Sequence, residues 1–393
     1  MKKLIILGST GSIGESALEV VSLHPDLYSV EGLSANKDIE KLFQQCLKFK
    51  PSSVAVADEK SAEKFSKLLK KNNLDIEVFT GRDGLNALAA MPEASIVIAA
   101  IVGSAGLEPT LEAIRCKKQI LLANKEALVM AGSFFIQEIK KWGAKLLPID
   151  SEHNAIFQCL PENYINDNDD RNVRKVYLTA SGGPFRNLPY AEFDSITPEQ
   201  ACAHPNWDMG PKISVDSATM MNKGLEIIEA RWLFDILPER IEVVIHPQSI
   251  VHSMVEFIDG SVLAQLSNPD MRVPIANALA WPDRHDSGAK PLNIFEIANL
   301  DFFKPDFNKF PCLQLAYDAI NAGGSFPAIL NAANEVAVQN FLSNRISFNS
   351  IPRVIENSMK IFTGEVPSDL ASLIALDREV KEKAEQIAAK LVK

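Results

Sequence analysis

The feature that most constrains the fold is an alternation of short apolar runs and helical stretches over the first 150 residues. The apolar runs are expected to be strands, at residues 3–8, 28–34, 53–57, 76–79, 95–101, 119–122 and 144–149. The helical stretches between them cover residues 13–24, 38–49, 60–71, 83–90, 107–117 and 125–142. Alternation at this spacing predicts a Rossmann-like, doubly wound parallel sheet with helices on both faces.

A glycine-rich turn follows the first expected strand and opens the first expected helix. Its pattern is Gly-x-x-Gly-x-x-Gly instead of the Gly-x-Gly-x-x-Gly fingerprint. Glycines let the backbone approach a pyrophosphate, and a helix N-terminus supplies N–H donors and positive potential. A purely structural turn is the alternative, but the alternating units around the turn favour a dinucleotide. The expected contacts are Gly8, Thr10, Gly11, Ser12 and Ile13.

The end of the second strand bears on the choice of dinucleotide. An acidic residue there would bind the ribose hydroxyls of NAD. This chain has Asn36 and Lys37 instead, and a lysine suits the additional phosphate of NADP. Asp38 follows, either as an opposing charge or as the N-cap of the next helix. We therefore expect NADPH.

A different pattern begins after the polar run at residues 166–171. Expected strands at 173–180, 242–246, 251–258 and 261–267 indicate an antiparallel or mixed sheet, and Asp259-Gly260 joins the last two in a hairpin. Helices at 217–235 and 272–281 are expected to cover it, and the tail is helical at 313–322, 328–342, 350–361 and 369–391. The expected division is a dinucleotide domain at 1–149, an α+β catalytic domain at 150–285, a connecting arm at 286–311 and a helical bundle at 312–393.

Carboxylates at the end of the seventh strand suggest a metal site. Asp150 and Glu152 can converge on one cation if the backbone turns there, and oxygen ligands of this kind suit Mg²⁺ or Mn²⁺. The alternative is that they cap and charge a helix start. A third carboxylate is needed, and Glu226 is the candidate, one helical turn beyond Asn222. The alternative for Glu226 is a solvated helix face.

The end of the sixth strand offers a lysine at the edge where ligands of such sheets bind. Asn124 and Glu126 flank Lys125, and these two fit a helix cap and its first turn as well as a ligand site.

Hydroxyls and glycines suggest an oxyanion site in the second region. Ser181 precedes Gly182-Gly183, a loop whose N–H groups can bind an oxyanion. The expected helix at 217–235 adds a hydroxyl and a helix N-terminus. Each feature alone fits a turn or a cap, but together they form a plausible phosphate cradle. Its members are Ser181, Ser217, Asn222 and Lys223.

The polar segment from His204 to Pro211 predicts a mobile lid. Trp207 in a proline-flanked loop could lie over a substrate, although packing against the domain is the alternative. His153 and His204 lie beside the expected site, whereas His246 and His252 fall on expected strands and fit a structural role.

Bulk properties limit the partners. The net charge of −10 argues against a nucleic-acid surface. Five cysteines without Cys-x-x-Cys spacing fit free thiols in a reducing cytoplasm. No apolar run is long enough for a signal peptide or a membrane span, so we expect a cytoplasmic protein.

These motifs together resemble the 1-deoxy-D-xylulose 5-phosphate reductoisomerase family. The resemblance rests on residues 8–14, 121–126, 148–157, 181–185, 204–226, 246–255 and 260–272. It implies a homodimer that rearranges and reduces 1-deoxy-D-xylulose 5-phosphate to 2-C-methyl-D-erythritol 4-phosphate in non-mevalonate isoprenoid biosynthesis, with NADPH and Mg²⁺, Mn²⁺ or Co²⁺. Retroaldol cleavage with re-addition and a direct ketol shift both fit the site. Asp38 departs from the expected asparagine.

The resemblance also implies roles for single residues. The expected metal ligands are Asp150, Glu152 and Glu226, and Lys125 and His153 join them in the catalytic set. Substrate contacts are expected from Lys125, Ser151, Glu152, Ser181, His204, Trp207, Ser217, Asn222, Lys223 and Glu226, with Met209 also in the lid. Further cofactor contacts are expected from Asn36, Lys37, Asn124, Glu126 and Gly210.

Two other functions compete with this one. The first is a plain NADPH-dependent dehydrogenase of a phosphorylated hydroxy acid, which a metal-free reaction would favour. The second is a nucleotide-sensing regulatory protein without chemistry, which would have lost the three carboxylates.

Overall fold

The protein is described here from a computed structural model, in which residues 1–161, 172–203 and 210–392 are placed well enough to describe. Their contacts divide the chain into two compact units. The first unit consists of Met1–Ala127, Ser133–Asn154 and Asp270–Lys290. The second consists of Leu128–Gly132, Ala155–Pro269 and Pro291–Lys393. The predicted division into four domains remains a prediction, because these two units are defined by contacts and do not test the predicted boundaries.

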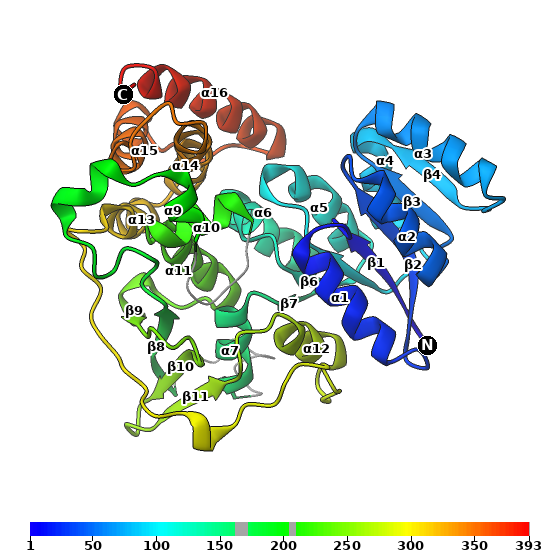
Figure 1. Cartoon of the computed structure of the whole chain (residues 1–393), viewed down its shortest axis with the longest axis horizontal. Helices are drawn as coiled ribbons and strands as arrows, with labels where there is room; N and C mark the ends of the chain where they lie inside the picture. Colours follow the sequence, from blue (N-terminus) through cyan, green and yellow to red (C-terminus); the bar gives the residue numbers. More distant parts are fainter. Residues whose placement is uncertain (162–171, 204–209, 393) are drawn as a thin grey trace. The chain divides into compact units, whose positions relative to one another are not determined.

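The first unit contains the predicted parallel sheet (Figure 1). Its strand order is β4-β3-β2-β1-β5-β6-β7, and every pairing is parallel. The strands are β1 (Lys2–Leu7), β2 (Tyr28–Ala35), β3 (Ser53–Val56), β4 (Glu77–Thr80), β5 (Ile96–Ala99), β6 (Gln119–Leu122) and β7 (Lys145–Pro148). β1, β3 and β5 are buried over most of their length, as expected for strands covered on both faces. The predicted Rossmann-like sheet is confirmed.

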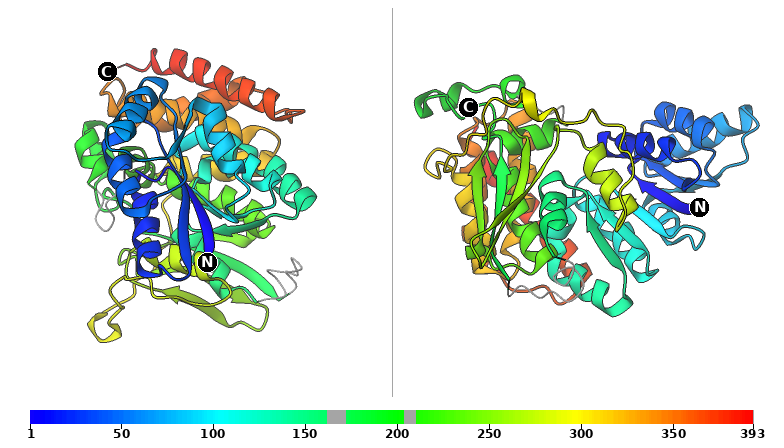
Figure 2. Two further views of the ribbon diagram at one scale, coloured as in Figure 1. Left: turned by 90° about the vertical axis from the view of Figure 1, so that its right-hand side faces the viewer. Right: turned by 90° about the horizontal axis from the view of Figure 1, so that it is seen from below.

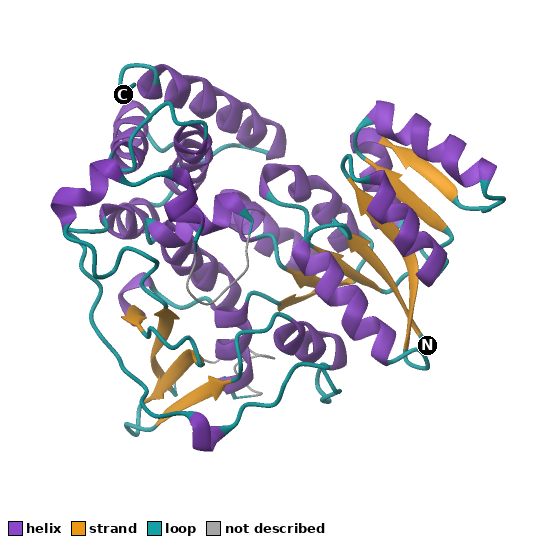
Figure 3. Cartoon of the chain, viewed as in Figure 1, coloured by secondary structure: helices purple, strands orange, loops and turns teal. Residues whose placement is uncertain are grey.

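Helices alternate with these strands as predicted (Figure 3). They are α1 (Ser12–Leu23), α2 (Ile39–Phe49), α3 (Glu59–Lys71), α4 (Gly81–Ala90), η1 (Gly103–Gly106), α5 (Leu107–Arg115), α6 (Lys125–Trp142) and α7 (Ser151–Cys159). Strands β2 to β4 are added successively on one side of β1, whereas β5 to β7 are added on its other side. Right-handed crossovers therefore place α2 and α3 on one face and α4 and α5 on the other, consistent with the contacts within each pair. Polar side chains at the carboxyl ends of β1, β6 and β7 consequently share one sheet edge.

One predicted helix lies in another place. Residues 272–281 were expected to cover the second sheet, but α12 (Arg272–Ala280) belongs to the first unit and packs against α1, β6 and β7. The Tyr28 hydroxyl donates to the carbonyl oxygen of Leu279, 3.0 Å away. All residues from Pro274 to Ala280 are buried, so the apolar pattern of this helix does not indicate which neighbour it covers.

The second unit contains a mixed four-stranded sheet in the order β11-β10-β8-β9. Its strands are β8 (Val173–Ala180), β9 (Ile241–Ile245), β10 (Val251–Phe257) and β11 (Val262–Leu266). β10 is antiparallel to β8 and β11, whereas β8 and β9 are parallel. Gly260 has φ +88° in the predicted hairpin turn, a backbone conformation that favours glycine. The predicted mixed sheet is confirmed.

The helix predicted over 217–235 is two helices, α10 (Pro211–Ala218) and α11 (Met221–Phe234). Met220 between them is in the left-handed conformation, with φ +63°. Gly210 is the N-cap of α10 and Pro211 follows at its first position, a start signal that the lid prediction overlooked. Ser217 therefore lies in the last turn of α10, so its predicted place at a helix N-terminus is wrong.

Helices complete the second unit. They are η2 (Tyr190–Ser195), α9 (Pro198–Cys202), η3 (Pro238–Arg240), η4 (Ile294–Glu296), α13 (Pro311–Ala322), α14 (Phe326–Leu342), α15 (Ser350–Ile361) and α16 (Leu370–Ala388). α11 packs on β8 and β9, α13 packs on α11, and α14 packs on α13 (Figure 2). The predicted helical tail is confirmed. Among the described helices, none is long and apolar enough to cross a membrane.

Candidate active site

The glycine turn after β1 is built for close backbone approach. Gly8 has φ +83°, and a Cβ there would lie 2.7 Å from the carbonyl oxygen of Ala100. A Cβ on Gly14 would lie 2.5 Å from the carbonyl oxygen of Gly8. Gly11 is the N-cap of α1 and has no side-chain cap. The turn thus presents the N-terminus of α1 at the carboxyl edge of the sheet, where an anionic ligand is favoured.

Buried polar groups fix this turn to the neighbouring strand, and the sequence analysis did not predict them. The Ser9 hydroxyl lies 2.7 Å from Oε1 of Gln45 and 3.1 Å from the carbonyl oxygen of Ser34. The Ser34 hydroxyl accepts the Gly8 N–H at 2.8 Å. The sequence signal for this contact was the presence of Ser9 and Ser34 at the ends of two adjacent strands, because buried polar groups need hydrogen-bond partners.

The residues after β2 include the helix cap that was one of the two alternatives for Asp38. Asn36 and Lys37 are exposed just beyond the strand. Asp38 is the N-cap of α2 and accepts the N–H of Lys41 at 3.0 Å. The capping role of Asp38 is confirmed, so its carboxylate is engaged by the helix and Lys37 supplies the positive charge at this edge.

At the end of β6, the helix cap and a buried lysine occur together. Asn124 caps α6 by accepting the N–H of Ala127 at 3.1 Å and donates to Gly103 at 2.9 Å. Lys125 is buried, and its Nζ lies 2.6 Å from Oδ2 of Asp150 at the end of β7. Glu126 is also buried. The ammonium group of Lys125 therefore contacts a carboxylate at the end of the neighbouring strand, at the sheet edge where ligands of such folds bind.

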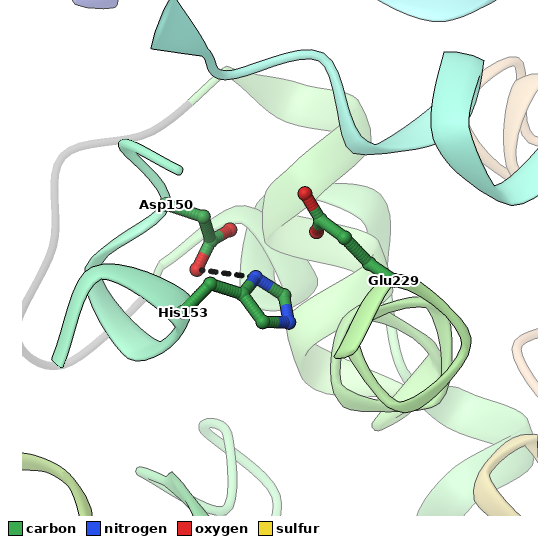
Figure 4. Close-up of side chains that lie close together, drawn as sticks. All are labelled: Asp150, His153 and Glu229. Carbon is green, nitrogen blue, oxygen red and sulfur yellow. Dashed lines mark ion pairs between the residues drawn. The ribbon is translucent and has the colours of Figure 1, made fainter. Parts of the chain in front are cut away.

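Asp150 and Glu152 lie together where β7 runs into α7. One carboxylate oxygen of each lies within 4.8 Å of the other. The Glu152 N–H donates to Oδ1 of Asp150 at 3.3 Å, and the Ser151 hydroxyl donates to Oε2 of Glu152 at 2.5 Å. Nδ1 of the fully buried His153 lies 3.7 Å from Oδ1 of Asp150 (Figure 4). This pair fits both a helix start and two oxygen ligands for one cation.

In the second unit, α11 carries a buried carboxylate with two polar neighbours. Glu226 is only 1% exposed, and its Oε1 accepts a 2.5 Å hydrogen bond from Asn222. Its Oε2 forms an ion pair with the buried Lys223. Glu229, also drawn in Figure 4, lies one turn further and is fully buried. The solvated-face interpretation of this helix is therefore wrong, and Glu229 is a buried acid that the sequence reading missed.

The glycine loop after β8 closes on the end of α10. Gly182 and Gly183 have φ of +83° and +67°, and the Ser181 hydroxyl accepts the Gly183 N–H at 3.1 Å. A Cβ on Gly183 would lie 2.8 Å from the carbonyl oxygen of Ser217. Asn222 and Lys223 occupy the first turn of α11, which begins after Met220. The helix N-terminus that belongs to the predicted cradle is therefore the N-terminus of α11.

Two histidines have structural partners. His246 is buried, its Nδ1 lies 2.9 Å from the carbonyl oxygen of Asp301, and its Nε2 accepts the N–H of Ile250. Nε2 of His252 lies 2.9 Å from the Ser267 hydroxyl. Burial, helped by the charge of Lys223, lowers the pKa of His252 to about 4. His252 is thus neutral at physiological pH.

The predicted lid residues His204, Trp207 and Met209 lie outside the described residues. Gly210, predicted to contact the cofactor, is exposed at the N-cap of α10. That contact remains a prediction.

Three family profiles match successive parts of the chain. Residues 4–132 match 1-deoxy-D-xylulose 5-phosphate reductoisomerase. Residues 146–234 match the C-terminal domain of the same enzyme, and residues 266–383 match the DXP reductoisomerase C-terminal domain. The matches therefore extend over both units.

Relatives and solved structures agree with these matches. The 1-deoxy-D-xylulose 5-phosphate reductoisomerase of Nitrosomonas europaea is 56% identical over 98% of this chain and 93% of its own length. That of Methylococcus capsulatus is 54% identical over 98% of each chain.

Two solved reductoisomerases are also similar. One, in complex with NADPH, fosmidomycin and magnesium, has a TM-score of 0.94 and 42% identity over 99% of this chain and 98% of its own. The Zymomonas mobilis enzyme with NADPH has a TM-score of 0.92 and 43% identity over 99% and 100%. With this sheet edge, these carboxylates and this similarity, the chain belongs to the 1-deoxy-D-xylulose 5-phosphate reductoisomerase family.

Proposed function

We propose that this protein is an NADPH-dependent reductoisomerase that converts 1-deoxy-D-xylulose 5-phosphate to 2-C-methyl-D-erythritol 4-phosphate with a divalent metal ion. The observation that carries the proposal is the pair of carboxylates of Asp150 and Glu152, within 4.8 Å at the carboxyl edge of the nucleotide-type sheet. A metal-chelating pair at the edge where the nicotinamide is expected is what a combined rearrangement and reduction needs.

NADPH is assigned to the edge formed by the ends of β1, β2 and β6. The turn from Gly8 to Ile13 would hold the pyrophosphate on the N-terminus of α1. The exposed Lys37, with Asn36 beside it, suits the additional phosphate of NADPH. Asn124 and Glu126 at the end of β6 are the assigned contacts further along the edge. Both solved relatives named above contain NADPH, which supports this choice.

Asp150, Glu152 and Glu226 are the proposed metal ligands. Their donor atoms are carboxylate oxygens, which Mg²⁺ and Mn²⁺ prefer, and one solved relative contains magnesium. Glu226 is buried, and Asn222 and Lys223 each contact one of its two carboxylate oxygens. When bound, the metal supplies Lewis-acid polarisation of the substrate's ketone and hydroxyl oxygens. Lys125 orients Asp150 through their ion pair.

The substrate's phosphate is assigned to Ser181, Ser217, Asn222 and Lys223. The approach of Gly183 to the backbone of Ser217 supports one cradle made from both segments. Lys223 supplies a buried positive charge, and the first turn of α11 supplies its helix potential. Ser151 and His153 are assigned to the substrate's hydroxyl end, beside Asp150.

Other parts of the proposal follow from the family. The polar segment that contains His204 and Trp207 is assigned as the closing lid, which would exclude water from a reactive intermediate. We also propose a homodimer. The cytoplasmic location stays a prediction.

The decisive assay follows NADPH oxidation with 1-deoxy-D-xylulose 5-phosphate, first in EDTA and then with Mg²⁺ or Mn²⁺ restored. We expect turnover only with metal. Absence of turnover in both conditions would refute the proposal, and equal turnover in both would favour the plain dehydrogenase.

A further inference from the structure

A buried polar contact joins the C-terminal helices to the helix beside the proposed phosphate cradle. Nδ2 of Asn334, in the middle of α14, donates a 2.8 Å hydrogen bond to Oδ1 of Asp216 in α10. Asp216 is 1% exposed and Asn334 is fully buried. Oδ2 of Asp216 lies 2.9 Å from Nζ of Lys212, one turn earlier in α10. Both carboxylate oxygens are therefore engaged, one by each helix.

This contact lies next to residues assigned to the phosphate. Asp216 precedes Ser217, whose carbonyl oxygen is the atom that a Cβ on Gly183 would meet at 2.8 Å. Two residues later, the Thr219 hydroxyl accepts the N–H of Met221, the first residue of α11. The position of α10 thus sets both the Ser217 side and the α11 side of the cradle.

Packing alone would not require this polar pair. α10 and α14 are in contact, and apolar side chains could fill the space between them. A charge-assisted hydrogen bond is directional, so it fixes the rotation and axial position of α10 where apolar contacts tolerate sliding. Among residues 1–161, 172–203 and 210–392, no group lies within hydrogen-bond distance of the buried amide oxygen of Asn334, so the bond to Asp216 is the side-chain hydrogen bond that this amide makes there.

We propose that Asn334 is a positioning residue for phosphate binding, which acts through Asp216 on α10 and so gives the C-terminal helices a part in substrate affinity. This inference rests on the proposed function, because it concerns the same phosphate cradle. It assigns no contact between Asn334 and the substrate.

The test replaces Asn334 with leucine, which has a similar volume but cannot donate to Asp216. We expect the KM for 1-deoxy-D-xylulose 5-phosphate to rise about tenfold, as one lost charge-assisted hydrogen bond would produce. The Kd of fosmidomycin, which carries a phosphonate, should rise by a similar factor, whereas kcat should fall less and the Kd of NADPH should stay within about twofold.

A matched control is available in the same helix. Asn340 is also buried, but it bonds to the carbonyl oxygen of Val336 and to Glu385 of α16, within the C-terminal helices. Asn340→Leu should lower thermal stability without the change in KM. If Asn340→Leu raises KM as much as Asn334→Leu, general loosening explains the result and the inference fails.

A rescue variant separates positioning from packing. The exchange Asp216→Asn with Asn334→Asp keeps a hydrogen bond between an amide and a carboxylate across the two helices, although Lys212 then faces an amide, so its KM should lie clearly nearer to that of the wild type than the KM of Asn334→Leu does. If Asn334→Leu does not fold, Asn334→Ser takes its place. If the wild-type protein turns over and the folded variant has an unchanged KM, this inference alone is overturned. If the wild-type protein itself shows no turnover, the proposed function is overturned.

Discussion

Nζ of Lys125 lies 2.6 Å from Oδ2 of Asp150, and the two side chains are 6% and 11% exposed. The lysine begins α6 after β6, and the aspartate follows β7, so neighbouring strands of the sheet bring the pair together. A carboxylate assigned to a metal is thereby held in place by a buried cation. The pair links the fold of the sheet directly to the proposed chemistry.

Breaking this ion pair should destabilise the protein. Asp150→Asn or Lys125→Met leaves one buried charge without its partner, at a cost of about 3–5 kcal/mol in the free energy of unfolding. The double variant Lys125→Met with Asp150→Leu should lose less than the sum of the two single losses, because no unpaired charge remains. Urea unfolding in EDTA measures all of them. Strictly additive losses would show that the pair is not coupled.

Removing the assigned metal ligands should abolish turnover and spare the dinucleotide. Glu152→Gln and Glu226→Gln each remove one carboxylate charge with little change in volume, so metal-dependent turnover should fall at least about a hundredfold. The Kd of NADPH, measured by fluorescence titration, should change less than about threefold. Glu239→Gln, an exposed change in the same unit as Glu226, serves as the control. Loss of NADPH binding in both variants would contradict the metal assignment.

His252 should make stability depend on pH. Its pKa of about 4 in the folded protein lies below the ordinary 6.5, chiefly because of burial. The unfolded chain then binds the proton first, so the free energy of unfolding falls as pH decreases from 6.5 towards 4, by up to about 3 kcal/mol.

The variant His252→Gln cannot take up this proton. Comparing unfolding free energies at pH 7.5 and pH 5 should show a decrease in wild type that is about 2 kcal/mol larger than in the variant. An equal pH dependence in both proteins would mean that His252 titrates normally in the fold.

The close packing of α11 against α13 should require a glycine at position 224. A Cβ there would lie 2.6 Å from Cβ of Ala316 in α13. Gly224→Ala should therefore lower the free energy of unfolding by about 1–3 kcal/mol from overpacking, reduced by the roughly 1 kcal/mol that alanine gains within a helix. Adding Ala316→Gly removes the clash, so the double-mutant cycle should show favourable coupling. Additive losses would rule out this contact as the reason for the glycine.

The sheet of the first unit was predictable because its signal is local and repeated. Strands β1 to β7 alternate with helices at regular spacing, and each helix start carries a cap or glycine close to its strand, such as Asn124 after β6. The polar residues at the strand ends then follow from topology, because parallel strands place their carboxyl ends at one edge. Asp150 and Lys125 were found in this way.

The remaining features depend on contacts distant in sequence. Met220 adopts the left-handed conformation, which is uncommon for methionine, so the sequence pattern predicted a single helix at 217–235 and placed no helix start at Pro211. α12 is apolar all round, and only the fold shows that it packs on α1. The contact of Asn334 with Asp216 joins positions 118 residues apart. No local pattern could pair them.

The most direct test of the central claim is product analysis of a complete reaction. Purified protein, 1-deoxy-D-xylulose 5-phosphate, NADPH and Mg²⁺ should yield 2-C-methyl-D-erythritol 4-phosphate in equal amount to the NADPH oxidised, and EDTA should stop both. A product with the unbranched carbon skeleton of the substrate, formed with oxidation of NADPH, would contradict the account, because the protein would then reduce without rearranging.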